Sequence, residues 1–201
     1  MMRDHRQWRC CARSLAPLLL LVCLVFARCS KPEFNNIDIT GADYARDFAL
    51  TDATGPARTL ADYRGKVVVL FFGYTHCPDV CPTTLAQLAQ ARHMMGAEAD
   101  RVQVLFVTLD PRRDTPQLLA RYTQAFDPSF VALTGTQQQI EATAREFKVF
   151  FQEVAGPAPD SYTLDHSSGS FVFDPQGRVR LYVPDRARAE QVAPDLRRLA
   201  G

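Results

Sequence analysis

Two long apolar runs place the strongest limit on what this chain can fold into. Residues 67–74 read VVVLFFGY and residues 102–109 read VQVLFVTL, and both runs are rich in β-branched and aromatic side chains. Such runs are typical of strands buried on both faces, which occur where helices cover both sides of a parallel or mixed sheet. Residues 83–95, between the two runs, carry apolar side chains at helical spacing. The sequence therefore predicts a strand–helix–strand unit with parallel strands.

The remainder of the chain continues this alternation of helices and strands. Helix starts are indicated at Asp114 in the segment DTPQ and at Thr136 in the segment TQQQ. Three further strands are expected, at residues 149–154, 170–174 and 179–183. A last helix is predicted over residues 186–199, where Pro194 should cause a kink or a restart. With a β-hairpin at residues 48–60, this is the pattern of a three-layer α/β sandwich with an N-terminal β-hairpin extension.

The first 29 residues have the features of an export leader. Four arginines precede residues 14–27, which carry no charge and as a helix would span about 21 Å, less than the ~30 Å core of a bilayer. A basic start followed by a short apolar stretch is typical of a secretion signal. Cys29 then offers a lipid attachment site, although Arg28 stands where a small residue is usual. An uncleaved anchor, and cleavage near Ala27 that releases the domain, are the alternatives.

This leader predicts the location of the rest of the chain. Because the basic end of such a segment stays in the cytoplasm, the following residues are delivered across the membrane. We therefore expect a protein of the bacterial inner membrane whose folded part faces the periplasm. Residues 30–46 are polar and are expected to form a tether, and residues 47–201 are expected to form one folded domain.

The charge of the exported part gives no indication of a nucleic-acid partner. The whole chain has 23 basic and 22 acidic residues, but five of the basic residues and one of the acidic residues lie within the first 29. The remainder has 18 basic and 21 acidic residues, a net charge of −3. A basic footprint that would bind nucleic acid or anionic lipid is therefore not expected.

The six cysteines are distributed too unevenly for a disulfide-stabilised scaffold. Four lie in the first 29 residues, and only Cys77 and Cys81 lie in the folded part. These two stand in the segment CPDVCP, directly after the apolar run at residues 67–74 and at the start of the first predicted helix. The unpaired N–H groups and the dipole of a helix N-terminus favour the thiolate over the thiol. Because thiols four residues apart can lie on one face of a helix, the pair is predicted to be either a redox dithiol or part of a metal site.

A third ligand would separate these two interpretations, and histidine is the residue type to look for. His5 lies in the leader, His93 lies within a predicted helix, and His76 adjoins the first cysteine, where neighbouring side chains point apart. His166 stands in the segment YTLDHSSG, just before the strand expected at residues 170–174. In thioredoxin-type folds the loop at this place lies against the dithiol, so His166 is the candidate third ligand.

Three segments in this order resemble a known family. They are residues 73–85 (GYTHCPDVCPTTL), residues 106–116 (FVTLDPRRDTP) and the segment DHS at residues 165–167. Over residues 47–200 the chain resembles the Sco/SenC/PrrC family of membrane-tethered, thioredoxin-fold proteins. Members of this family are needed for the insertion of copper into cytochrome c oxidase. The resemblance therefore implies a thioredoxin-like fold and a role in copper delivery.

The resemblance also implies a ligand set and partners. One copper ion would be held by Cys77, Cys81 and His166, with Asp79 and Asp165 as supporting residues around them. Delivery would be to the CuA site of subunit II of cytochrome c oxidase. In the oxidising periplasm the dithiol would form a disulfide, so a thiol reductant and a copper donor are further expected partners. Thiolates suit Cu(I) and imidazole suits copper in either oxidation state, while zinc could also occupy such a set.

Two other functions are to be distinguished from copper delivery. A thiol–disulfide reductase would need only Cys77 and Cys81, and would act without copper on cysteines of the oxidase or of other exported proteins. A thiol peroxidase of the peroxiredoxin type has a threonine three residues before its reactive cysteine. Tyr74 occupies that position here, which disfavours the peroxidase.

The segment DPRRD at residues 110–114 has two interpretations. Asp110 ends a predicted strand and Asp114 is predicted to cap a helix, which would be a purely structural role. Alternatively, the segment supports the site or docks a partner, because it follows a strand at the same edge of the sheet as Cys77.

Overall fold

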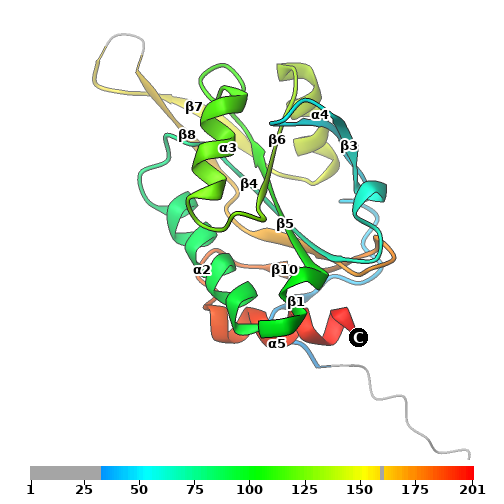
Figure 1. The fold of residues 1–201 in the computed structure, drawn as a ribbon. Coiled ribbons are helices and arrows are strands. Elements are labelled where there is room, and N and C mark those ends of the chain that lie inside the picture. Colours follow the sequence, from blue (N-terminus) through cyan, green and yellow to red (C-terminus); the bar gives the residue numbers. More distant parts are fainter. Residues whose placement is uncertain (1–32, 159–160) are drawn as a thin grey trace, which may run out of the picture. The chain divides into compact units, whose positions relative to one another are not determined.

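A mixed β-sheet organises the part of the chain that the computed structural model describes, residues 33–158 and 161–201 (Figure 1). The strands are β1 (Ile37–Asp38), β2 (Ala49–Asp52), β3 (Ala57–Thr59), β4 (Val67–Gly73), β5 (Val102–Thr108), β6 (Val131–Thr134), β7 (Phe151–Ala155), β8 (Tyr162–His166), β9 (Ser170–Phe173) and β10 (Val179–Val183). The helices are α2 (Val80–Met94), α3 (Pro116–Gln124), α4 (Gln137–Glu146) and α5 (Ala189–Ala200), with short 3-10 helices η1 (Leu60–Tyr63) and η2 (Gly96–Arg101). The sheet has the strand order β1-β10-β9-β4-β5-β6-β2-β3, and β7 and β8 form a separate two-stranded sheet.

The two apolar runs form the central pair of strands. β4 and β5 are parallel, in a register that pairs Val67 with Val102 and Gly73 with Thr108. Every residue of both strands is buried. β6 continues the parallel pairing beside β5, whereas β9 lies antiparallel on the other side of β4. The predicted strand–helix–strand unit is therefore confirmed, with α2 as its helix.

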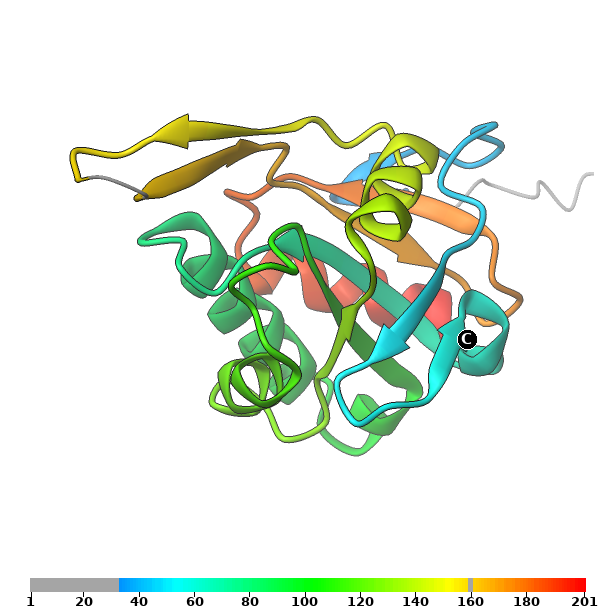
Figure 2. The same ribbon diagram turned by 90° about the horizontal axis from the view of Figure 1, so that it is seen from above.

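Helices cover both faces of this sheet. Phe71 and Phe106 share one face, where the ring of Tyr122 from α3 lies 5.6 Å from the Phe106 ring. Phe72 points to the other face and meets Phe147, at the end of α4, at 5.2 Å. Figure 2 shows α2 and α3 on one side of the sheet and α4 on the other, and α5 packs against α2. This arrangement confirms the predicted three-layer sandwich, and β2 with β3 forms the expected hairpin extension.

The folded unit begins before residue 47. The contacts group residues 34–201 into one unit, in which β1 pairs antiparallel with β10. The N–H groups of Asn35 and Asn36 donate hydrogen bonds to the buried carboxylate of Asp195 in α5, at 2.9–3.0 Å. Part of the segment expected as a tether, residues 30–46, thus belongs to the sheet and contacts α5. Its polar composition does not reveal this, because the polar groups satisfy a buried carboxylate.

Three helices differ in detail from the sequence predictions. α2 begins at Val80, three residues earlier than expected. The N-cap of α3 is Thr115 rather than Asp114, since the Thr115 side chain accepts the capping hydrogen bond. Of the kink or restart predicted at Pro194, the restart is absent, because α5 runs through this residue as one helix. The carbonyl that loses its helical partner there belongs to the exposed Glu190, which can bind water instead.

The hairpin of β7 and β8 is the main feature that the sequence did not predict. A strand was expected at residues 149–154 and is present as β7, but β8 was not anticipated. The hairpin extends away from the main sheet in Figure 2. His166 is the last residue of β8 and is not part of a loop.

The leader and Cys29 lie outside the described residues, so their export and anchoring stay expectations. Across residues 33–158 and 161–201 no helix is both long and apolar enough to cross a bilayer.

Candidate metal centre

Three side chains from distant parts of the chain meet at one end of the sheet. The sulfurs of Cys77 and Cys81 and a ring nitrogen of His166 all lie within 4.8 Å of one another. Cys81 Sγ is 3.7 Å from His166 Nε2, although 85 positions separate the two residues in sequence. Both cysteines are free thiols. The three residues singled out in the sequence therefore form a set that could hold a metal ion.

The loop between β4 and α2 brings the two cysteines together. Cys81 lies in the first turn of α2 and is fully buried, whereas Cys77 precedes the helix and is partly exposed. The N–H of Cys81 points to Cys77 Sγ at 3.5 Å. At the end of β4, a Cβ on Gly73 would lie 2.7 Å from Cys81 Sγ and 2.9 Å from Phe106 Cε2. Glycine at position 73 therefore leaves the space in which the Cys81 thiol packs.

The two thiols differ strongly in proton affinity. The Cys81 thiol donates a hydrogen bond to the Cys77 sulfur, and this contact lowers the pKa of Cys77 to about 3. Burial opposes the shift, while His166 and the N–H groups of Asp79 and Cys81 support it. The same hydrogen bond, together with burial, raises the pKa of Cys81, against the effect of the Tyr74 N–H. The reduced pair is therefore expected to hold one proton on Cys81 and to present Cys77 as a thiolate.

A main-chain contact orients the imidazole of His166. Its Nδ1 lies 2.9 Å from the carbonyl oxygen of Ser167, and an Nδ1–H donates to this oxygen. With Nδ1 bonded to this oxygen, Nε2 is the ring nitrogen that faces Cys81 and can offer its lone pair to a metal ion. Metal-binding histidines commonly donate their other N–H to an oxygen in this way. The imidazole is thus already arranged as a ligand.

Tyr74 connects the two halves of the site, a role that the sequence analysis missed. Its hydroxyl oxygen accepts a hydrogen bond from the Leu164 N–H in β8 at 3.2 Å. Its ring packs edge-on against His166, with centroids 6.0 Å apart, and its own N–H contacts the Cys81 sulfur. Tyr74 is buried, and burial raises the pKa of its hydroxyl. The available signal was a tyrosine at the end of a buried strand, because a buried hydroxyl needs a partner.

A buried carboxylate in the segment of residues 110–114 holds the cysteine loop. Asp114 accepts hydrogen bonds from the N–H and the hydroxyl of Thr75, at 3.1 and 2.6 Å, and from the Thr108 hydroxyl at 2.6 Å. The prediction of Asp114 as a helix cap is therefore wrong. The carboxylate instead ties the loop that leads to Cys77 to the end of β5, which agrees with the alternative of a supporting role.

The remaining histidines lie apart from the three-residue set. His76 is half-exposed, and its Nδ1 lies 3.6 Å from Asp114 Oδ1. His93 is exposed near the end of α2 that is remote from the cysteines. His5 lies outside the described residues, as does Cys29.

A pocket of about 380 Å³ opens onto the Cys77 thiol and the His166 imidazole. Cys77 and His166 line it together with Asp79 and Asp165, whose side chains are exposed. The contact that Asp79 makes to the cysteines comes from its N–H rather than from its carboxylate. The supporting roles expected for these two acids stay predictions. The pocket leaves one side of the set open to an approaching partner.

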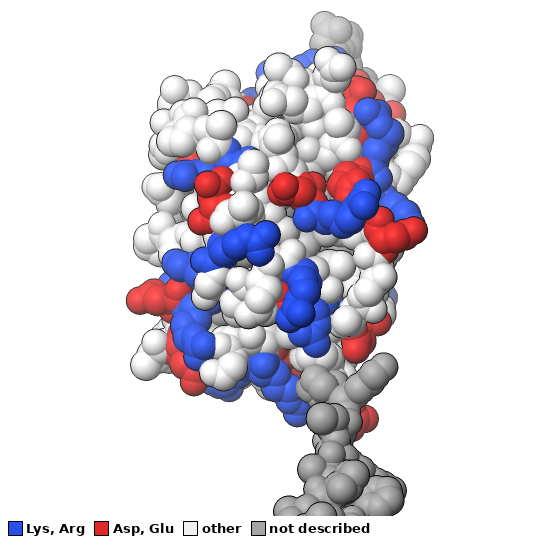
Figure 3. All heavy atoms as spheres, turned by 90° about the vertical axis from the view of Figure 1, so that its right-hand side faces the viewer, with Lys and Arg blue, Asp and Glu red and all other residues white. Residues whose placement is uncertain are grey.

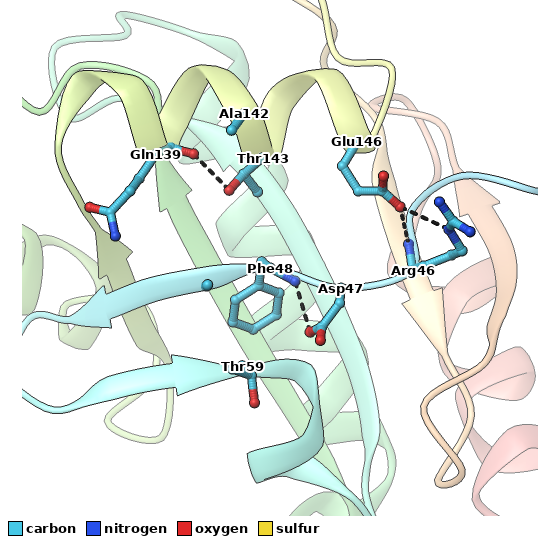
Figure 4. A pocket seen from close by; sticks show the side chains of 9 residues that line it. Arg46, Asp47, Phe48, Thr59, Gln139, Ala142, Thr143 and Glu146 are labelled. Carbon is cyan, nitrogen blue, oxygen red and sulfur yellow. Dashed lines mark hydrogen bonds and ion pairs between the residues drawn. The ribbon is translucent and has the colours of Figure 1, made fainter.

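Other parts of the surface differ from this pocket in their chemistry. A groove of about 680 Å³ between α4 and the β2–β3 hairpin is lined by Phe48 and Thr143, and by Arg46 whose N–H and Nε donate to Glu146 (Figure 4). It contains neither cysteine nor histidine. On the face shown in Figure 3, basic and acidic side chains are interspersed. Such a mixture produces no strong field of one sign.

Comparison with known proteins finds similarity over most of the chain. The family model described as SCO1/SenC matches residues 38–201. The mitochondrial SCO2 homolog of Bos taurus is 41% identical over 156 residues, which cover 76% of this chain and 58% of the relative. The chain thus spans about three fifths of the length of the mitochondrial relatives that it matches.

Solved structures with the same fold include copper-bound and copper-free proteins. ScoI of Bradyrhizobium japonicum with copper bound has a TM-score of 0.70 and 37% identity, and the match covers 76% of this chain and 97% of that chain. Apo Sco1 of Thermus thermophilus has a TM-score of 0.74 and 37% identity, with 85% and 99% covered. These similarities confirm the thioredoxin-like fold that the sequence resemblance implied.

Proposed function

Because this chain belongs to the SCO1/SenC family, we propose that it is a copper metallochaperone that binds one copper ion through Cys77, Cys81 and His166. The observation that carries the proposal is the convergence of two sulfurs and an imidazole nitrogen within 4.8 Å, with the imidazole oriented by Ser167. The copper bound to the related ScoI of Bradyrhizobium japonicum supports it.

The chemistry of the ligand set suits copper as a cargo. Two thiolates and one imidazole favour Cu(I), which accepts trigonal coordination by soft ligands. The contact with Cys81 lowers the pKa of Cys77 and the pKa of Cys81 is raised, so we expect binding to release the proton held on Cys81 and to be promoted by rising pH. Because the pocket is open on one side, ligands of a partner can reach the metal before Cys77, Cys81 and His166 have all released it.

We infer the destination of the cargo from the family resemblance. Copper is passed to the CuA site of subunit II of cytochrome c oxidase. The chain works at the bacterial inner membrane, held by its N-terminal leader, with the metal-binding domain in the periplasm. A periplasmic copper donor loads the site after a thiol reductant has reduced the disulfide of Cys77 and Cys81, since only the thiolates bind the metal.

A second function, thiol–disulfide reduction, is favoured by the unequal thiols. Partly exposed Cys77 has the low pKa of an attacking thiolate, and buried Cys81 is adjacent to it. Cys77 would attack a disulfide of the target and form a mixed disulfide, releasing one target thiol. Cys81, on losing its proton, would then attack Cys77, release the second target thiol and leave a Cys77–Cys81 disulfide. Two electrons thus pass to the target, and His166 is not required.

The variant His166→Ala separates the two functions. In the reduced full-length chain in detergent, we expect the Cu(I) dissociation constant to rise by more than ~10-fold and delivery to a fragment of oxidase subunit II to be lost. Reduction of a disulfide substrate should continue. His93→Ala makes the same change at an exposed histidine and should alter neither property. If His166→Ala bound and delivered copper as the parent does, the metallochaperone proposal would fail.

A further inference from the structure

We propose that Arg113 is a positioning residue that holds His166 against the cysteines by fastening β8 to the loop after β5. Arg113 forms this fastening with Asp110 and Tyr162, and the three residues are called the latch below. The proposal rests on the proposed function, because His166 is the copper ligand that the latch positions. Opening the latch weakens copper binding and leaves the dithiol intact. The latch therefore determines which of the two chemistries the site performs.

The hairpin that carries His166 depends on contacts outside itself. Within residues 33–158 and 161–201, β7 and β8 pair with each other and with no strand of the main sheet. Four of the five residues of β7 are exposed. A two-stranded hairpin of this kind has marginal stability on its own. The position of His166 is therefore set by the points at which β8 touches the body of the domain.

The latch is the contact at the Tyr162 end of β8. The guanidinium carbon of Arg113 lies 3.5 Å from the centroid of the Tyr162 ring, and its Nη1 donates to the Tyr162 carbonyl at 2.8 Å. The Tyr162 hydroxyl donates to Asp110 Oδ1 at 2.8 Å, and Arg113 Nε forms an ion pair with the same carboxylate. The Asp110 side chain is almost fully buried. Stacking and charge-assisted hydrogen bonds at a partly buried place are among the stronger polar contacts.

The geometry of β8 transmits this contact to the imidazole. Side chains at alternate positions of a strand point the same way, so Tyr162, Leu164 and His166 share the inward face. Their neighbours Thr163 and Asp165 are exposed. Leu164 lies in the middle of this row, and its N–H donates a hydrogen bond to the Tyr74 hydroxyl oxygen. The strand is paired with β7 along its whole length, so the hairpin moves as one unit when its attachment at Tyr162 is lost.

The same short segment of chain also holds the cysteines, but by a different residue. Asp114 accepts hydrogen bonds from Thr75 in the cysteine loop, whereas Arg113 donates a hydrogen bond to Tyr162 in β8. Residues 110–114 therefore contact both halves of the metal centre. Arg113 also lies over the Tyr74 ring, 5.9 Å from its centroid, whereas the hydrogen bonds from this segment to Thr75 in the cysteine loop are made by Asp114. Loss of the Arg113 contacts should displace the imidazole and leave the hydrogen bonds between Asp114 and Thr75 in place. This separation distinguishes a positioning role from a general loss of stability.

The test compares Arg113→Met with Arg92→Met in the reduced full-length chain in detergent. Arg92 is a suitable control because it is also largely buried and is ion-paired, with Asp100 and Asp127. It lies eleven residues after Cys81, about 16 Å along α2. The measurements are amide hydrogen exchange of β8 in the copper-free protein, Cu(I) affinity by competition with a chromophoric chelator, and the midpoint potential of the dithiol.

For Arg113→Met we expect exchange in β8 to become at least ~10-fold faster and the Cu(I) dissociation constant to rise by roughly 10–100-fold. The dithiol should stay redox-active, with a midpoint potential that shifts no further from the parent value than it does in His166→Ala, and Arg92→Met should change none of the three. Tyr162→Phe is a milder variant that removes only the hydroxyl that donates a hydrogen bond to Asp110. It should also raise the exchange rate in β8 and the Cu(I) dissociation constant. Its control is Tyr63→Phe, which removes a buried hydroxyl that has no hydrogen-bond partner.

A double variant shows whether Arg113 acts through His166. In the His166→Ala background, Arg113→Met should leave Cu(I) affinity unchanged, and an equal loss in both backgrounds would overturn the proposal. If amide hydrogen exchange in β8 is as slow in copper-free Arg113→Met as in the parent, the proposal that the latch holds β8 is wrong, whether or not the chain binds copper. A different result would show that the metallochaperone proposal is wrong: the parent and His166→Ala would bind Cu(I) with equal affinity.

Discussion

Replacing Gly73 by alanine tests the packing that places the Cys81 thiol. The new Cβ would lie 2.7 Å from Cys81 Sγ and 2.9 Å from Phe106 Cε2. These distances are about 0.6–0.8 Å shorter than the ~3.5 Å at which non-bonded heavy atoms make favourable contact. Gly73 is the last residue of the buried strand β4 and is paired with Thr108 of β5, which restricts movement of its backbone. The thiol or the phenyl ring must move instead.

The expected cost follows from this overlap. Adding a methyl group to a closely packed core typically destabilises a protein by about 1–3 kcal/mol. For a domain of this size each kcal/mol lowers the melting temperature by roughly 2–4 °C, so a decrease of about 2–12 °C is expected. Movement of the Cys81 sulfur also disturbs its 3.7 Å approach to His166, so the Cu(I) dissociation constant should rise as well.

Thermal unfolding of the reduced, copper-free protein and Cu(I) competition measure the two effects. Cys81→Ala provides the matched background, because it removes the sulfur that the new methyl group meets. Gly73→Ala should cost less stability in that background than in the parent. An unchanged melting temperature and an unchanged Cu(I) affinity of Gly73→Ala would refute the reasoning. An equal loss in both backgrounds would assign the clash to Phe106 alone.

Two further predictions concern the loop that carries the cysteines. The contact with Cys81 lowers the pKa of Cys77 to about 3, so the rate of Cys77 alkylation should stay high as the pH is lowered from 8 to about 4. An alkylation rate that already drops as the pH is lowered from 9 to 8 would contradict this. Because the folded-state pKa lies below the unfolded value, the stability contributed by Cys77 is complete above the unfolded value of ~8.5 and is lost as pH falls toward 3. In Asp114→Asn, an NH2 group that cannot accept a hydrogen bond replaces one carboxylate oxygen facing the donors of Thr75 and Thr108. The free energy of unfolding measured in urea should therefore fall by about 1–3 kcal/mol. An unchanged urea midpoint would show that these hydrogen bonds contribute little.

The parts of the fold that follow from local patterns were predictable from the sequence. The runs that became β4 and β5 are recognisable because each strand is buried on both faces. The N-terminus of α4 was predicted because Thr136 and Gln139 form a capping box within four residues. The cysteine pair was placed correctly for the same reason, since a strand end, a turn and a helix start adjoin one another in the chain.

The parts that depend on distant partners were not predictable in the same way. Asp114 and Thr115 are both good capping residues, and only the position of Thr75 and Thr108 in the fold decides that Asp114 is used elsewhere. β8 has the alternation of a strand, but it is only five residues long, and the segment GPAPDS at residues 156–161 indicates a turn without showing that the next strand pairs back with β7. Its attachment through Tyr162 to residues 110–114 involves a sequence separation of about fifty residues.

This division between local and distant contacts also separates the two chemistries of the site. The dithiol is built within one loop and one helix turn, so the low pKa of Cys77 depends on contacts within that short segment and on its approach to His166. The metal set needs His166 from 85 positions away, on a hairpin held by Tyr74 and by the latch. On the proposed functions, a perturbation that loosens the hairpin removes copper binding first and affects the dithiol only through the lost contact between His166 and Cys77. Displacement of β8 alone is therefore expected to weaken copper binding while both cysteines remain able to exchange with a disulfide.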